Sequence, residues 1–261
     1  MKIGFIGCGN MGGALARAVA RVAYAKVCLY DKDTDRALAL GKEIDAKAVT
    51  LTSIAECDYV FLGVKPNIIA PVVSELSQIL GERTVLITMA AGVATSQVEA
   101  ALGRKAPIIR IMPNTPVAYG KGMILYTATE EVEDAMLDKF LDFMKFAGKL
   151  DKIPEKLIDA GSAVSGCGPA FVYMFIEALA DGGVAAGLPR DKAMQYAAET
   201  VVGAATMVLE SGKHPGALKD AVCSPGGSTI EGVLTLEGGG MRGVVSEAVV
   251  AAYEKTKQLG K

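Results

Sequence analysis

The sequence predicts an α/β protein with a doubly wound, mostly parallel sheet in its N-terminal part and an all-α C-terminal domain. Up to residue 152, short apolar runs alternate with helical patterns, and this alternation is typical of a parallel sheet. From residue 153 onward strand-like runs disappear, and glycine and proline separate successive helical patterns. We therefore expect a sheet domain over residues 1–152 and a helical domain over residues 153–261.

Short apolar runs define the strands that we expect in the first domain, at Lys2–Ile6, Lys26–Tyr30, Tyr59–Val64, Thr84–Met89, Ile108–Met112 and Met123–Tyr126. Helices are expected after the first strand, over Asp33–Lys42, from a capping box at Ser96 and Glu99, and over Val132–Phe146. The expected helices of the second domain are Glu155–Ala163, Pro169–Ala186, Arg190–Glu210, Ala217–Val222, Ser228–Leu236 and Met241–Leu259.

The amino-acid composition argues against nucleic acids and membranes as partners. The formal net charge is −2, so there is no basic excess to neutralise a phosphate backbone, and we expect no nucleic-acid partner. No uninterrupted apolar run has the length of a membrane span, so no membrane partner is expected. The chain is nevertheless 51% hydrophobic and rich in Ala, Val and Gly, which favours closely packed helices or a subunit interface.

Cysteine and histidine usage limits the chemistry. Five scattered cysteines without a C-x-x-C pair indicate reduced thiols in a cytoplasmic protein, not disulfides or a zinc site. We assign a steric role to Cys8 and Cys167, which stand beside glycines. The single histidine, His214, excludes a His-rich metal site, and its Gly- and Pro-rich surroundings predict a solvated loop.

A glycine fingerprint follows the first strand, which ends at Ile6. Its residues are Gly7, Cys8, Gly9, Asn10, Met11 and Gly12, and a helical pattern comes directly after them. In such a G-x-G-x-x-G loop the first glycine makes a tight turn, the second lets the backbone approach a pyrophosphate, and the third allows close helix–strand packing. The fingerprint predicts a Rossmann-type domain that binds a dinucleotide.

Asp31 ends the second strand, about 20 residues beyond this loop, where an acid binds the adenosine ribose of NAD. This position favours NADH. Lys32 and Arg36 lie close by in sequence and could meet the 2′-phosphate of NADPH. Asp31 could also simply begin a turn or cap the next helix, so NADH and NADPH both remain open.

Three further segments follow predicted strands. Ligands of doubly wound sheets lie at the carboxyl ends of the strands, so these segments are candidates to line the cofactor groove. The candidate residues are Gly63, Val64, Lys65, Pro66, Ala90, Ala91, Gly92 and Asn114. Pro66 and Pro113 could also serve only to end their strands.

A second glycine-rich loop lies far along the chain. It consists of Ser224, Pro225, Gly226, Gly227, Ser228 and Thr229 and leads into a helical pattern. Ser228 and Glu231 have capping-box spacing, which predicts a helix start there. Backbone N–H groups at a helix start favour an anion such as a carboxylate. Alternatively, the loop is an ordinary connection between two helices and binds no ligand.

Seven stretches, spread in order over nearly the whole chain, together resemble the pyrroline-5-carboxylate reductase family. They are Phe5–Gly12, Gly63–Pro66, Met89–Val93, Arg110–Pro116, Ser165–Phe171, Ala180–Val184 and Ser224–Ile230. The resemblance implies reduction of the C=N bond of 1-pyrroline-5-carboxylate to L-proline by NADPH or NADH. It also implies homodimers built through the helical domain, often assembled into decamers.

The resemblance also implies roles for single residues. The loop from Ser224 to Thr229 would hold the substrate carboxylate, and Thr229 would lie near the ring nitrogen as the catalytic residue. The glycine loop, Lys65, Pro66, Ala90, Ala91 and Asn114 would line the dinucleotide site. Asp31 departs from the small hydroxyl residues that many members carry there.

Two other functions fit parts of the pattern. A β-hydroxyacid dehydrogenase also joins a Rossmann domain to a helical one, but it uses a helix lysine in a setting that Lys192 and Lys219 lack. A non-catalytic dinucleotide sensor would keep the glycine loop without needing the hydroxyl-rich second loop.

Overall fold

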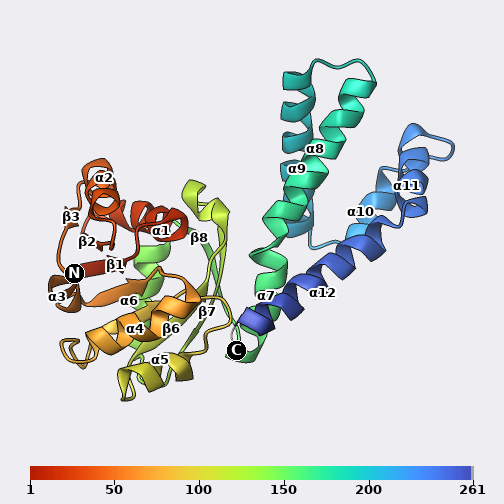
Figure 1. Ribbon diagram of the computed structural model, residues 1–261. Helices are drawn as coiled ribbons and strands as arrows, with labels where there is room; N and C mark the ends of the chain where they lie inside the picture. Colours follow the sequence, from red (N-terminus) through yellow and green to blue (C-terminus); the bar gives the residue numbers. More distant parts are fainter. Residues whose placement is uncertain (260–261) are drawn as a thin grey trace. The chain divides into compact units, whose positions relative to one another are not determined.

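The computed structural model describes residues 1–259 (Figure 1). An eight-stranded sheet runs in the order β3-β2-β1-β4-β5-β6-β7-β8. Neighbouring strands are parallel except β6 and β7, which are antiparallel. The strands are β1 (Lys2–Ile6), β2 (Lys26–Tyr30), β3 (Lys47–Ala48), β4 (Tyr59–Leu62), β5 (Val85–Thr88), β6 (Ile108–Met112), β7 (Gly122–Ala128) and β8 (Gly148–Lys152). The expected doubly wound sheet is confirmed.

Helices cover both faces of this sheet because each central strand is apolar on both sides. In β1, Ile3 and Phe5 point into one core, whereas Ile6 points into the other. The first core packs against α1 (Asn10–Ala20), α2 (Thr34–Ile44) and α6 (Asp134–Met144), and the second against α3 (Leu51–Ala55), α4 (Pro66–Leu76) and α5 (Thr95–Leu102). The stacked rings of Phe5 and Phe61, 4.3 Å apart, lie at the centre of the first core.

Five elements of this region are not predicted from the sequence. The strand β3 has only two residues, and β8 is polar and largely exposed, so neither gives an apolar run. The helix α3 has five residues, and α4 contains Pro71 in its interior, which conceals its helical pattern. The short 3₁₀ helix η1 (Thr115–Tyr119) was likewise not expected.

The capping box expected at Ser96 and Glu99 is wrong. The helix α5 begins two residues earlier than expected, with Ala94 as its N-cap residue and Thr95 as its first helical residue. The Ala94 N–H donates to the side-chain oxygen of Gln97, 2.8 Å away, and this bond satisfies the helix start in place of a serine. Glu99 instead pairs with Lys105.

The first compact unit extends beyond the expected boundary at residues 152/153. It comprises Met1–Cys167 together with the end of the chain from Ala252, and the second unit is Gly168–Ala251. The helix α7 (Glu155–Ser165) belongs to the first unit because Ile158 is fully buried beside Met112 and Leu125. Since glycine and proline frame α7 on both sides, sequence alone cannot show on which unit it packs.

An ion-pair cluster also fastens α7 to the sheet. Arg110 on β6 is 2% exposed and pairs with Glu155 and Asp159 of α7. Glu155 also accepts hydrogen bonds from the Thr95 backbone and hydroxyl, at 2.8 and 2.9 Å. A charged group this deeply buried is stable only while its partners remain.

The second unit consists of helices: α8 (Gly168–Ala185), α9 (Arg190–Ser211), α10 (Pro215–Ala221), α11 (Ser228–Gly238) and the greater part of α12 (Met241–Leu259). The all-α prediction is confirmed. The helices α8 and α9 lie side by side in Figure 1, and their contact buries only the small side chains Ala180, Ala193 and Ala197. Many large apolar side chains stay exposed, among them Tyr173, Met174, Val202 and Leu209.

These exposed helices bear on the expectation about membranes. Among residues 1–259, the stretch Glu155–Ala185 is the one long and apolar enough, by length and composition, to cross a membrane. This finding differs from the expectation that no segment has that length. The finding rests on the many apolar side chains and few charges of this stretch, whatever their exposure.

We predict that Arg110→Met destabilises the protein by about 3 kcal/mol, because Glu155 and Asp159 would lose their partner beside the core. Arg83→Met is the matched control, since Arg83 is exposed and, within the described part of the chain, pairs only with the exposed Glu133. It should cost at most about 1 kcal/mol. Denaturant unfolding measures both free energies, and equal losses for the two variants would contradict the cluster's role.

Candidate functional site

The glycine loop between β1 and α1 is held by contacts of backbone on backbone. A Cβ added to Gly12 would lie 2.1 Å from the Gly7 carbonyl oxygen, and one added to Gly7 would lie 2.5 Å from that of Gly63. Gly7 also adopts φ +93°, which side chains disfavour. The Gly7 N–H donates to the Tyr30 carbonyl at 2.8 Å, and this bond ties the loop to the end of β2.

Gly9 differs from these three glycines because a Cβ there would meet no atom within 4 Å. It is the N-cap residue of α1, and no side chain caps the helix start within the described part of the chain. The N–H groups at the beginning of α1, around Asn10 and Met11, therefore face an open cradle. This geometry fits a dinucleotide pyrophosphate, which binds at a helix N-terminus.

Asp31 lies directly after β2 and contacts the loop. Its carboxylate accepts hydrogen bonds from the N–H groups of Cys8, at 2.7 Å, and Asp33, at 2.9 Å. The Arg36 guanidinium lies 3.7 Å from it. Burial, followed by the Asp31 charge, raises the pKa of the Cys8 thiol to about 11. Cys8 is thus protonated at neutral pH and is a poor nucleophile. Its steric role stays a prediction.

The other candidates follow the carboxyl ends of neighbouring parallel strands, so the sheet brings them to the same edge as Ile6 and the glycine loop. Gly63 and Val64 follow β4, Lys65 and Pro66 are the N-cap and first residues of α4, and Ala90, Ala91 and Gly92 follow β5. Strand order reverses between β1 and β4, and doubly wound sheets bind ligands at this point.

Asn114 follows β6 and is 9% exposed. Its amide donates to the Ser165 carbonyl and accepts from the Met123 N–H, each at 2.9 Å. The side chain therefore links β7 and the end of α7 to this edge of the sheet. Its contact with a cofactor stays a prediction.

The second loop lies in the helical unit. Gly226 has φ +64°, and the Gly227 N–H donates to the Ser224 carbonyl at 3.0 Å, which closes a tight turn. The helix α11 begins at Ser228, as expected, but the capping box is wrong: Gly227 is the N-cap residue and no side chain caps it. Ser228 is one position too far along to cap, so its hydroxyl is left exposed.

The loop thus presents uncapped N–H groups and hydroxyls to solvent. Ser224, Pro225, Ser228 and Thr229 are all exposed. No hydrogen bond of the Thr229 hydroxyl occurs within the described residues. Such a turn can accept a carboxylate through backbone donors.

His214 proved to have a role that sequence reasoning missed. It is the N-cap residue of α10, and its Nδ1 accepts the Gly216 N–H at 3.1 Å. Pro215 at the first helical position was the available signal. No group of residues able to hold a metal ion occurs within residues 1–259.

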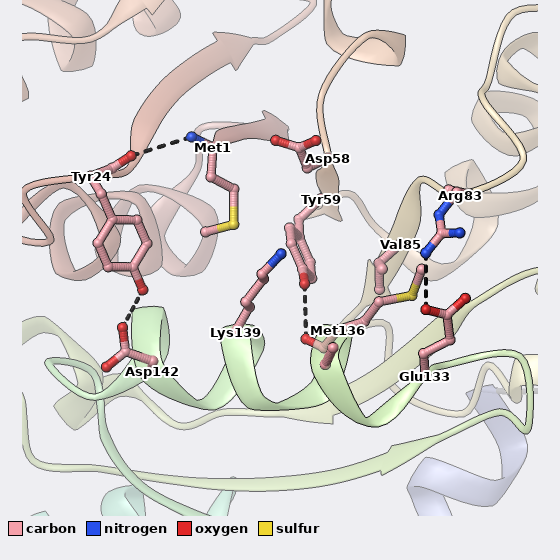
Figure 2. A pocket seen from close by; sticks show the side chains of 11 residues that line it. Met1, Tyr24, Asp58, Tyr59, Arg83, Val85, Glu133, Met136, Lys139 and Asp142 are labelled. Carbon is pink, nitrogen blue, oxygen red and sulfur yellow. Dashed lines mark hydrogen bonds and ion pairs between the residues drawn. The ribbon is translucent and has the colours of Figure 1, made fainter.

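A large cavity, about 780 Å³, lies at the opposite edge of the sheet, by the amino ends of β1, β4 and β5. Figure 2 shows that Tyr24, Tyr59 and Arg83 each bond to a residue of α6 or to its N-cap residue. The pairs are Tyr24 with Asp142, Tyr59 with the Met136 carbonyl at 2.8 Å, and Arg83 with Glu133 at 2.9 Å. These bonds attach α6 to the sheet, and the cavity contains none of the predicted site residues.

Comparison with known proteins decides between the possible families. The family model "Pyrroline-5-carboxylate reductase dimerisation" matches residues 155–259, and "NADP oxidoreductase coenzyme F420-dependent" matches residues 2–92. The chain is 42% identical to pyrroline-5-carboxylate reductase of Escherichia coli, over 100% of this chain and 98% of that protein. The chain belongs to the pyrroline-5-carboxylate reductase family. The resemblance noted from the sequence is confirmed.

Solved structures agree with this assignment. The NADP-bound pyrroline carboxylate reductase of Plasmodium falciparum has a TM-score of 0.89 and 33% identity, covering 100% of this chain and 98% of that one. A 3-hydroxyisobutyrate dehydrogenase of Mycobacterium tuberculosis has a TM-score of 0.53 and 16% identity, covering 71% of this chain and 64% of that one. That likeness is one of fold alone, so nothing favours the dehydrogenase alternative for this reductase family member.

The glycines allow a prediction that separates cofactor contact from folding. Gly9→Ala should leave the free energy of unfolding within about 1 kcal/mol, because its Cβ has space and Gly9 has an ordinary φ of −69°. Its methyl would occupy the cradle and raise the Kd for NADH or NADPH about tenfold or more. Titration of cofactor fluorescence and denaturant unfolding measure the two quantities.

Gly12→Ala is the contrasting variant. Its Cβ would collide with the Gly7 carbonyl, so it should lose about 3 kcal/mol or more of stability. A Gly9→Ala protein that binds cofactor as tightly as the unmodified chain would contradict the open cradle as the pyrophosphate site.

Proposed function

We propose that this protein reduces 1-pyrroline-5-carboxylate to L-proline with a hydride from NADH or NADPH. The observation that carries the proposal is the 42% identity over the whole chain to a protein named for this reaction. The open cradle at Gly9 in the first unit and the uncapped turn at Gly227 in the second supply the two kinds of binding surface that the reaction needs.

The two glycine-rich loops have different roles in this proposal: the first binds the cofactor and the second binds the substrate. When bound at the glycine loop, the dihydronicotinamide dinucleotide supplies the hydride. The backbone donors and hydroxyls from Ser224 to Thr229 hold the substrate carboxylate, and the Thr229 hydroxyl hydrogen-bonds the ring nitrogen. A charged acid or base is not required, since reduction of an imine mainly demands positioning.

The family assignment also supports a proposal about the oligomeric state of the protein. We propose a homodimer built through the helical domain, because its large apolar side chains are exposed in the single chain and the dimerisation family model spans residues 155–259. Further assembly into a decamer and a cytoplasmic location stay predictions. Sedimentation should give twice the chain mass of 27.1 kDa or a multiple of it, and a stable monomer would contradict the dimer.

A coupled pair of measurements tests the reaction and the role of Thr229. The unmodified protein should oxidise NADH or NADPH only when pyrroline-5-carboxylate is present, with L-proline as the product. Thr229→Ala should lower kcat about 100-fold, because the ring nitrogen loses its hydrogen-bond partner, while the cofactor Kd stays unchanged.

Thr235→Ala provides the matched control for this variant. Thr235 lies on the same helix, and among residues 1–259 its hydroxyl donates only to the Glu231 carbonyl, so turnover should be unaffected. Unchanged kcat in Thr229→Ala would remove Thr229 from the mechanism. No turnover of pyrroline-5-carboxylate by the unmodified protein would refute the function itself.

For the cofactor, we propose a preference for NADH. The Asp31 carboxylate is held in place by two backbone N–H groups, and it would repel a 2′-phosphate bound beside it. Arg36 lies near Asp31, but it also pairs with Asp33 at 3.3 Å. A like-charge contact of this kind is worth between about 1 and 4 kcal/mol, so NADH should bind about tenfold more tightly than NADPH or better.

Asp31→Asn should reverse or abolish this preference, since it removes the charge and retains an oxygen that accepts hydrogen bonds. Asp33→Asn is the control, because Asp33 is exposed and caps α2 through an oxygen that asparagine keeps. Direct binding titrations of the unmodified protein and the two variants with each cofactor give the six Kd values. Equal NADH and NADPH affinities in the unmodified protein would contradict the role of Asp31.

A further inference from the structure

Two of the five cysteines meet over β1, at a position where the strand has no side chain. Cys28 on β2 is the register partner of Gly4 on β1, so the two lie about 4.8 Å apart on adjacent strands. Cys57 lies just before β4, and its sulfur would be 3.2 Å from a Cβ on Gly4. The missing side chain of Gly4 makes room for the Cys57 sulfur and the Ile54 side chain, and Cys28 lies at the matching position of the adjacent strand.

Both thiols pack in the same hydrophobic cluster on this face of the sheet. The neighbouring Cys57 thiol lowers the pKa of Cys28, and the nearby charges of Lys2 and Lys47 lower it further, against the opposing effects of burial and Glu56. The neighbouring Cys28 sulfur, together with burial, raises the pKa of Cys57. The Cys57 thiol donates its hydrogen bond to the Ser53 carbonyl, 3.9 Å from its sulfur.

The two thiols differ in access. Cys28 is half-buried and lines a groove of about 730 Å³, together with Lys2, Lys47 and Glu56. Cys57 is 1% exposed and is not part of that groove. An external reagent can thus reach the Cys28 sulfur first, whereas the neighbouring Cys57 sulfur is inaccessible to it. The groove is lined by Lys2, Lys26 and Lys47 and by Asp45 and Glu56, and Lys2 pairs with Glu56. It therefore carries one more positive than negative charge, which favours a reagent that carries carboxylates.

We propose that Cys28 and Cys57 form a thiol–disulfide exchange site for a small, carboxylate-bearing disulfide such as oxidised glutathione. The Cys28 thiolate attacks one sulfur of the reagent, whose S–S bond breaks and releases one thiolate. Cys57 then gives up its proton to water and attacks the Cys28 sulfur, releasing the second thiolate. Two protein thiols are oxidised to one disulfide, and one reagent disulfide is reduced to two thiols.

The test treats the folded protein with oxidised glutathione, blocks the remaining thiols with iodoacetamide and maps the peptides by mass spectrometry. The expected product is a Cys28–Cys57 disulfide. Cys57→Ser should instead accumulate a stable mixed disulfide of glutathione at Cys28. Cys28→Ser should leave Cys57 unmodified, because Cys57 is buried. Circular dichroism checks that both variants are folded.

A second readout follows the rate of Cys28 alkylation by iodoacetamide against pH. In the folded protein the midpoint should lie at least about one pH unit below that of the same cysteine in guanidinium-unfolded chain, which corresponds to a tenfold larger thiolate-to-thiol ratio. Cys223→Ser is the control variant and should change neither result.

Either of two outcomes would overturn the proposal. One is a persistent mixed disulfide at Cys28 in the unmodified protein, because Cys57 would then fail to resolve it. The other is a Cys28 that reacts no faster when folded than when unfolded at neutral pH, with no internal disulfide formed. Both outcomes can be read without measuring reductase activity, so they are independent of the proposed function.

Discussion

The close approach of three glycine backbones underlies the whole first unit. Gly12 packs on the Gly7 carbonyl and Gly7 on that of Gly63, so the loop between β1 and α1 is pressed against the end of β4. Since any side chain at these positions would push the elements apart, the start of α1 is fixed relative to the sheet. Its uncapped N–H groups then face the open cradle at Gly9, and Asp31 fastens the loop through the Cys8 N–H.

Much of this could be predicted from the sequence, because the local signals agree with the tertiary structure. The ranges of β1, β2 and β6 are as expected, since each is a mainly apolar run that is followed by glycine, aspartate or proline. Other features depend on distant contacts. The polar strand β8 forms because it pairs with β7. The packing of α7 depends on Arg110, which in sequence looks like an interruption of an apolar strand.

Both expected capping boxes failed for a shared physical reason. A capping motif marks a helix start only if its serine adopts the extended N-cap conformation, and here Ala94 and Gly227 take that position. At Gly227 the difference matters for function, because the donors and hydroxyls of the turn are left free to bind a ligand. The individual site residues remain predictions, whereas the family, the fold and the kind of cofactor rest on agreement between sequence, structure and relatives.

The reaction that we propose for this protein is direct hydride transfer from a dinucleotide to the C=N carbon of pyrroline-5-carboxylate. A single-turnover reaction with NADH deuterated at the transferable C4 position tests it most directly. Direct hydride transfer predicts one deuterium per L-proline. It should lie on the δ carbon that formed the C=N bond and should not exchange with water. Proline without deuterium at that carbon, or no proline at all, would contradict it.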